Sequence, residues 1–147
     1  MTPGAPDELC AQLRDLILQH KGTVREMCVD ASLVLSCSLR QRGRDARLCT
    51  GNYVIEPLSY EYLEPHAYVR CGGMVYDPTR EQFEDLPLVV DRNDIHYQDE
   101  VWADFDLPEH PRFVHLARRW SDQQLQGRHA WYQIYSELGL APKGLVP

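Results

Sequence analysis

The chain has 147 residues, a length typical of one domain whose hydrophobic core needs no disulfide or metal support. Its 15 basic and 22 acidic residues give a net charge of −7 without any lysine- or arginine-rich run, which argues against a nucleic-acid binder or a protein of anionic membrane surfaces. No apolar stretch reaches the roughly 18–20 residues of a membrane span, and no signal-peptide pattern begins the chain. We therefore expect one cytoplasmic domain over residues 1–147, with delivery as an effector left open.

The first two expected elements are helices. Asp7 is a candidate N-cap for an amphipathic helix that ends at Gly22. Thr23 and Glu26 form a capping-box pattern that leads into a second helix, which is apolar nearly all round as far as residue 39. Cys28 lies near the start of that helix, in its second turn if Thr23 is the N-cap.

Strands are expected next. Residues 46–55 are rich in β-branched and aromatic side chains, and residues 56–65 have the composition of a loop. Two short apolar runs then flank Gly72 and Gly73, which predicts a hairpin with a two-residue loop that is closed by Asp77. The fold class expected from this order is α+β.

A strongly acidic segment follows. Residues 84–109 contain nine carboxylates and one arginine, a net charge of −8. With Pro87, Pro108 and the apolar anchors Trp102 and Phe105, this segment is expected to be extended and laid over the domain. A solvated surface explains the charge, and attraction of a basic substrate is the alternative. Helices are expected from Pro111 and over 131–138, within a C-terminal helical region at 110–140.

Cys28, His66 and Asp77 are the candidate catalytic residues. A helix N-terminus favours a thiolate, an imidazole serves as base and acid, and a carboxylate orients the imidazole. The two-residue hairpin loop sets His66 opposite Thr79 and Tyr68 opposite Asp77, so that His66 and Asp77 are diagonal neighbours on one face.

This order of residues resembles a known superfamily. Cys28, the run His66-Ala-Tyr-Val and the hairpin that ends in Asp77-Pro-Thr resemble the transglutaminase-like branch of the papain-like cysteine enzymes, over roughly residues 23–83. The phrase GGMVYDPTREQF is similar to small bacterial members, including toxin and effector domains. The resemblance implies a central helix packed on a small antiparallel sheet and a Cys-His-Asp triad formed by Cys28, His66 and Asp77. The chain departs from the family at Tyr68, where tryptophan is common, and at Val29, which follows the cysteine in place of tryptophan.

The function that this implies is cysteine-dependent amide hydrolysis through an acyl-enzyme, as in a peptidase or a protein-glutamine deamidase, on a peptide or protein substrate and without a cofactor. A transglutaminase or acyltransferase, a toxin-like effector, and a non-catalytic interaction module of the same fold are the alternatives. Tyr68, Arg80 and Gln82 are candidates for the substrate cleft, with hairpin packing and capping as the other interpretation. The backbone N–H of Cys28 is a candidate oxyanion donor. The sequence does not predict the oligomeric state.

Other histidines and cysteines are expected to be structural. His129 precedes Ala130 and Trp131, but helical periodicity and Leu140 eleven residues later argue against a catalytic role. His96, His110 and His115 lack metal-ligand spacing, so no metal site is expected. The five cysteines are odd in number and without a CxxC pair, which indicates free thiols in a reducing compartment. Parity along the strand directs Cys71 away from His66, and the core is the expected place of Cys10, Cys37 and Cys49.

Overall fold

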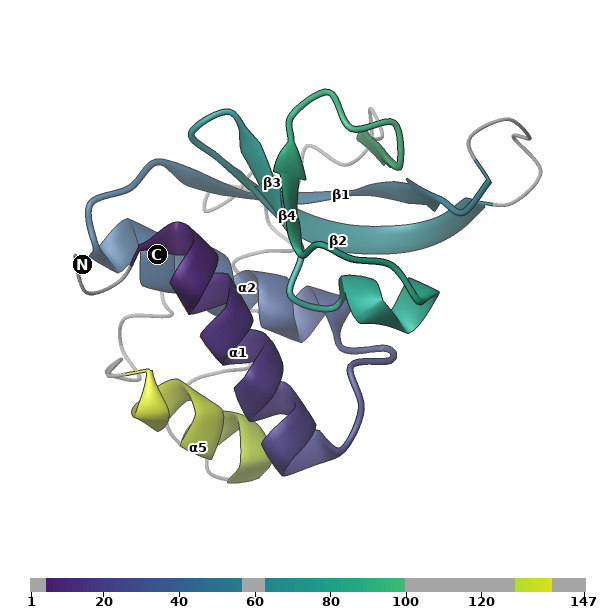
Figure 1. The fold of residues 1–147 in the computed structure, drawn as a ribbon. Coiled ribbons are helices and arrows are strands. Elements are labelled where there is room, and N and C mark those ends of the chain that lie inside the picture. Colours follow the sequence, from purple (N-terminus) through teal and green to yellow (C-terminus); the bar gives the residue numbers. More distant parts are fainter. Residues whose placement is uncertain (1–4, 57–62, 100–128, 139–147) are drawn as a thin grey trace.

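The computed structural model describes residues 5–56, 63–99 and 129–138. These residues form an α+β fold in which helices cover one side of a curled antiparallel sheet of five strands (Figure 1). The fold class expected from the sequence is therefore confirmed at this level. The helices are α1 (Pro6–Lys21), α2 (Cys28–Gln41) and α5 (His129–Glu137), together with the 3₁₀ helix η1 (Arg80–Phe83).

The N-cap of helix α1 lies two residues before Asp7, the predicted N-cap. Ala5 is the N-cap, and Pro6 occupies the first turn, where its fixed φ and missing N–H are tolerated. Asp7 lies in the first turn, where a negative charge favours the helix dipole. Gly22 ends the helix at φ 76°, and its N–H bonds to the carbonyl of Leu18, as expected for a glycine in the left-handed region.

The predicted capping box before α2 is wrong. The helix begins at Cys28, with Met27 as the N-cap, because Glu26 adopts φ 60° and interrupts any helix that would start at Thr23. The hydroxyl of Thr23 accepts a hydrogen bond from the backbone N–H of Arg25, only two residues on, at 3.1 Å. This correction moves Cys28 from the second helical turn to the first position.

The sheet has the order β4-β3-β2-β1-β5. Its strands are β1 (Ala46–Val54), β2 (Leu63–Cys71), β3 (Met74–Tyr76), β4 (Val89–Asp91) and β5 (Tyr97–Asp99). The predicted hairpin register is confirmed, since Cys71 pairs with Met74 and Val69 with Tyr76 around the two glycines. Strand β2 begins within the stretch that was expected to be a loop.

The acidic segment contributes to the sheet as far as residue 99. Its strands β4 and β5 lie at opposite edges, although only residues 92–96 connect them. The edges of a flat five-stranded sheet would be about 19 Å apart. Two backbone hydrogen bonds, from Asp94 to Asp91 and from Tyr97 to Asp94, make the connection compact. The sheet therefore curls so that the connection can join its two edges. The anchors Trp102 and Phe105, and the helix expected from Pro111, lie outside the described residues.

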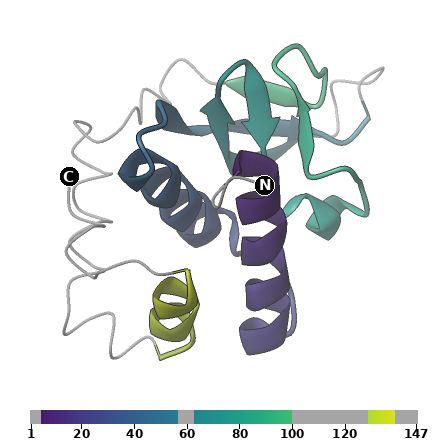
Figure 2. The same ribbon diagram turned by 60° about the vertical axis from the view of Figure 1, so that its left-hand side comes forward.

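Two apolar clusters lie on the two faces of the sheet. The larger cluster fills the space between the sheet and helices α1, α2 and α5, and it includes Ala67, Val69 and Tyr76 of the hairpin. Helix α2 packs on β1 and β2, and α1 packs on α2 and β3. Helix α5, which confirms the helix expected over 131–138, contacts α1 on the side away from the sheet in both views (Figures 1 and 2).

The smaller cluster lies inside the curl of the sheet. It is formed by Cys49, Tyr53, Tyr68, Val75 and Tyr97, with Phe83 and Val90 packed against it. The hairpin residues thus alternate between the two clusters, as the alternation of side chains along a strand predicts. His66 belongs to this inner face, since its ring lies against those of Tyr53 and Tyr68.

Candidate functional site

A buried histidine–carboxylate pair lies at the centre of the candidate site. Nε2 of His66, on β2, is 2.7 Å from Oδ2 of Asp77, the residue that follows β3. Both side chains are shielded from solvent, with 1% and 0% of their surfaces exposed. The two residues that the hairpin was expected to bring together are therefore in direct contact.

Asp77 is held by donors from three directions. Besides His66, the hydroxyl of Tyr97 donates to Oδ2 at 2.7 Å, and the N–H and hydroxyl of Thr79 lie 3.2 and 3.3 Å from Oδ1. The contact with Thr79 belongs to a turn, so Asp77 both forms the turn and holds His66, the two roles that the Asp-Pro sequence allows. A carboxylate with this many donors has little freedom to rotate, and it fixes the plane of the imidazole.

Tyr97 is the member of the site that sequence reasoning missed. It lies in the acidic segment, far from the hairpin in the sequence, and reaches Asp77 because β5 pairs with β1. Burial, together with the charge of Asp77 and the hydrogen bond to it, raises the pKa of Tyr97 far above its usual value, so the phenol remains a donor. The alternation of His96, Tyr97 and Gln98 was the available signal for a strand, but it was masked by the surrounding carboxylates.

Cys28 is the residue at the first position of α2 and is partly exposed. The first N–H groups of a helix have no partner within the helix, and they lie at its positive pole. The sulfur is close enough to His66 to affect its protonation. Burial alone would lower the pKa of His66, but the charge and hydrogen bond of Asp77, followed by those of Cys28, outweigh burial and raise this pKa from 6.5 to about 9.

The second ring nitrogen of His66 faces a different environment. Among the described residues, Nδ1 has no partner with the alignment of a hydrogen bond, although it is buried. The influence of Cys28 on the pKa of His66 therefore comes from a sulfur that lies near the ring without being aligned on Nδ1.

The other cysteines contrast with Cys28. Cys10 of α1 is also close to Asp77, but it is fully buried, and burial followed by the charge of Asp77 raises the pKa of its thiol far above the usual range. Burial raises the pKa of Cys37 to about 11 and also raises that of Cys71. Cys49 is buried. Cys28 is thus the one cysteine of the described chain that is not buried.

An open pocket of about 700 Å³ adjoins this cluster. Met27, which precedes Cys28, and Phe83, whose ring centroid is 4.9 Å from that of His66, both line it. Glu26 and Glu84 line it too, and they are the two non-glycine residues with positive φ in the described chain. Left-handed backbone of this kind costs about 1–2 kcal/mol per residue and concentrates at functional sites. The complete lining is Thr23, Arg25, Glu26, Met27, Ile55, Glu64, Gln82, Phe83 and Glu84.

The three cleft candidates from the sequence occupy different places. Gln82 lines the pocket, and its amide donates to the hydroxyl of Thr79 at 3.0 Å. Tyr68 is fully buried, and its hydroxyl donates to Asp99. Arg80 is 4% exposed, and its guanidinium donates to the hydroxyl of Tyr53 and to the carbonyl of Pro87. The surfaces of Tyr68 and Arg80 therefore contribute nothing to this pocket.

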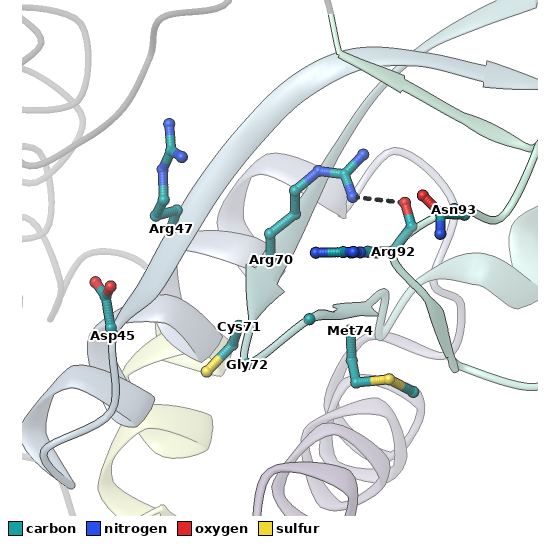
Figure 3. Close-up of a pocket in the computed structure, with 9 residues that line it drawn as sticks. Asp45, Arg47, Arg70, Cys71, Gly72, Met74, Arg92 and Asn93 are labelled. Carbon is teal, nitrogen blue, oxygen red and sulfur yellow. Dashed lines mark hydrogen bonds between the residues drawn. The ribbon is translucent and has the colours of Figure 1, made fainter.

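A second pocket, of about 380 Å³, lies at the hairpin loop. Figure 3 shows Arg70 reaching toward the backbone carbonyl of Arg92, with Asp45 and Arg47 on the other side of the pocket. The same guanidinium of Arg70 pairs with Asp99 at 3.0 Å. This pocket is lined mainly by arginines and glycines and includes neither Cys28 nor His66, so it is separate from the candidate site.

The remaining expectations concern histidines, metals and membranes. His129 begins α5, as its helical periodicity predicts, and Nδ1 of His96 is 2.7 Å from the carbonyl of Val54. His110 and His115 lie outside the described residues. Within residues 5–56, 63–99 and 129–138, no group of three or more histidine, cysteine or acidic side chains is placed to hold a metal ion. No helix of the described ranges has the length and apolar character to cross a membrane.

Comparisons with protein-family models, with curated proteins and with solved structures find no match to this chain.

Proposed function

We propose that the protein is a papain-like, transglutaminase-like cysteine enzyme that hydrolyses amides through an acyl-enzyme on Cys28. The observation that carries the proposal is the position of His66, whose ring is bonded to Asp77 through Nε2 and lies beside the sulfur of Cys28. Support comes from the place of Cys28 at the first position of α2 and from the pocket next to it.

The first half of the reaction acylates Cys28. At neutral pH the pKa of His66, about 9, keeps the imidazole charged, with one proton held by Asp77 and the other on Nδ1. This positive charge and the N-terminus of α2 stabilise a thiolate on Cys28. The thiolate attacks the carbonyl carbon, and a C–S bond forms as the carbonyl oxygen becomes an oxyanion. The C–N bond then breaks while Nδ1 gives its proton to the leaving amine or ammonia.

The second half releases the acyl group. The neutral imidazole takes a proton from water, the hydroxide attacks the thioester carbon, and the C–S bond breaks to return a carboxylic acid product and the Cys28 thiolate. First-turn N–H groups of α2 are the available donors for the oxyanion in both halves. Asp77 keeps the ring of His66 in the orientation that both proton transfers need.

Thiol reactivity tests the proposal without knowledge of the substrate. We expect iodoacetamide at about pH 6, where an ordinary thiol is protonated, to alkylate Cys28 faster than any other cysteine, as measured by peptide mass spectrometry. The variant His66→Gln removes the imidazolium and slows this alkylation. The control is Cys71→Ser, a change on β2, the strand that also holds His66. We expect it to leave the rate of Cys28 alkylation unchanged.

The acyl-enzyme itself is tested with 4-nitrophenyl acetate, an activated ester. We expect a burst of nitrophenol and an acetylated Cys28 that water then hydrolyses, both lost in Cys28→Ser. If Cys28 labels no faster in the folded protein than in urea, and Cys28→Ser leaves the burst intact, the protein is not a cysteine enzyme of this kind.

A further inference from the structure

The pocket beside Cys28 is mostly negative. Three glutamates, Glu26, Glu64 and Glu84, line it together with one cation, Arg25. None of the three carboxylates forms a hydrogen bond or an ion pair with another residue of the described part of the chain. Other acidic side chains of the fold do have partners: Glu81 pairs with Arg14, and Asp99 with Arg70. The uncompensated charge is therefore located where the substrate of the proposed reaction would lie.

The sequence around this pocket adds to the same charge. Glu56, the neighbour in sequence of the lining residue Ile55, is a further exposed glutamate. Glu84, which also lines the pocket, is the first residue of the acidic segment that gives the chain its net negative charge. A concave surface with charge of one sign concentrates oppositely charged ligands and raises their association rates.

The lining also has apolar surface. Met27 and Phe83 are half-buried, and Ile55, the residue that follows β1, is 40% exposed. Phe83 stacks on the buried ring of Tyr53, with ring centroids 4.0 Å apart, and this contact fixes its position. A ligand that matches this lining has apolar side chains for the floor and cationic side chains for the glutamates at the rim.

We propose that the acyl donor is a cationic peptide segment. Apolar side chains directly flank the residue whose carbonyl Cys28 attacks, and lysine or arginine lies beyond them on either side. This inference rests on the proposed function. The sequence allows two explanations of the acidic charge, a solvated surface or attraction of a basic substrate, and the inference selects the second. Glu64 and Glu84 are the specificity-determining residues in this assignment.

The test compares charged thiol reagents on the full chain. Cys28 is modified with methanethiosulfonates that carry a trimethylammonium or a sulfonate group, and each rate is divided by the rate of the same reagent with free 2-mercaptoethanol. We expect the cationic reagent to react about tenfold faster than the anionic one after this correction, as in other clefts of a single charge. In the double variant Glu64→Gln/Glu84→Gln the ratio falls to within about twofold. The matched control Glu8→Gln, at an exposed position of α1, keeps the ratio of the unmodified protein.

A second arm tests the peptide. The blocked pentapeptides Lys-Leu-Gln-Leu-Lys and Glu-Leu-Gln-Leu-Glu are compared for protection of Cys28 against iodoacetamide, and we expect only the lysine peptide to protect. A reagent ratio near one, or equal protection by both peptides, or protection by neither, overturns the inference. Slow alkylation of Cys28 by neutral iodoacetamide, whatever the ratio, instead overturns the proposed function, so the two failures are distinguishable.

Discussion

Replacement of Asp77 by asparagine tests the electrostatics of the buried pair. The carboxylate is the main reason that the pKa of His66 stands at about 9 rather than below 6.5, where burial alone would put it. The amide has nearly the same shape but carries no charge, and its single oxygen can replace only one of the two acceptor oxygens that bind Tyr97 and Thr79. In Asp77→Asn the pKa of His66 therefore falls.

The size of the effect follows from proton linkage. A folded-state pKa of about 9 against 6.5 in the unfolded chain corresponds to about 3 kcal/mol of unfolding free energy. Because the folded pKa is the higher one, this stabilisation is fully present below about pH 6.5 and is lost as the pH rises through about 9. We therefore expect the stability of the unmodified protein to decline over that range, and we expect that decline to be absent from Asp77→Asn.

Urea unfolding at a series of pH values measures this difference, and the C–H resonances of the His66 ring report its titration directly. Because the readout is the slope of stability with pH, a general loss of stability in Asp77→Asn does not obscure it. The variant Asp45→Asn, at an exposed position, controls for the loss of one negative charge. Parallel pH profiles for the unmodified protein and Asp77→Asn, or a His66 titration near 6.5 in the unmodified protein, would refute the reasoning.

Two further predictions concern the strand β5. A Cβ atom at Gly51 would lie 2.0 Å from the carbonyl oxygen of Gln98, so Gly51→Ala displaces β5 and lowers the unfolding free energy by about 1–3 kcal/mol. We expect faster amide hydrogen exchange in the β1–β5 ladder of this variant, and unchanged exchange would contradict the prediction. Tyr97→Phe removes a donor to the charged carboxylate of Asp77 and costs about 1.5–3 kcal/mol in urea unfolding. Tyr76→Phe, which loses only a 3.5 Å contact, serves as its control, and equal losses in the two variants would show that the Tyr97 hydroxyl contributes little.

Local rules account for the parts of the fold that the sequence predicted. The two glycines of the hairpin loop determine the pairing of β2 with β3, and the alternation along β2 places His66 on the face opposite Val69. These features depend on neighbours within a dozen residues, so turn chemistry and strand parity suffice to derive them. The contact between His66 and Asp77 is predictable for the same reason.

Features that depend on long-range pairing were not predictable in this way. The start of α2 differs from its prediction because a left-handed residue, Glu26, outweighs a favourable capping pattern. Strands β4 and β5 are short and are surrounded by carboxylates, so their patterns resemble those of exposed loops. Their place in the sheet is determined by pairing with β3 and β1, and Tyr97 consequently reaches Asp77 through a contact that no local pattern indicates.

The compact connection between β4 and β5 has a consequence for the site at a distance from it. Residues 92–96 join the two edges of the sheet, so the length of this loop limits how far the sheet can open. A longer loop would allow the edges to separate, and β5 would carry the Tyr97 hydroxyl away from Asp77. Insertions and deletions on the outer rim therefore change the hydrogen bonding of the central carboxylate without altering any residue that touches substrate. In this fold, loop length is a means by which evolution or design can adjust the basicity of His66.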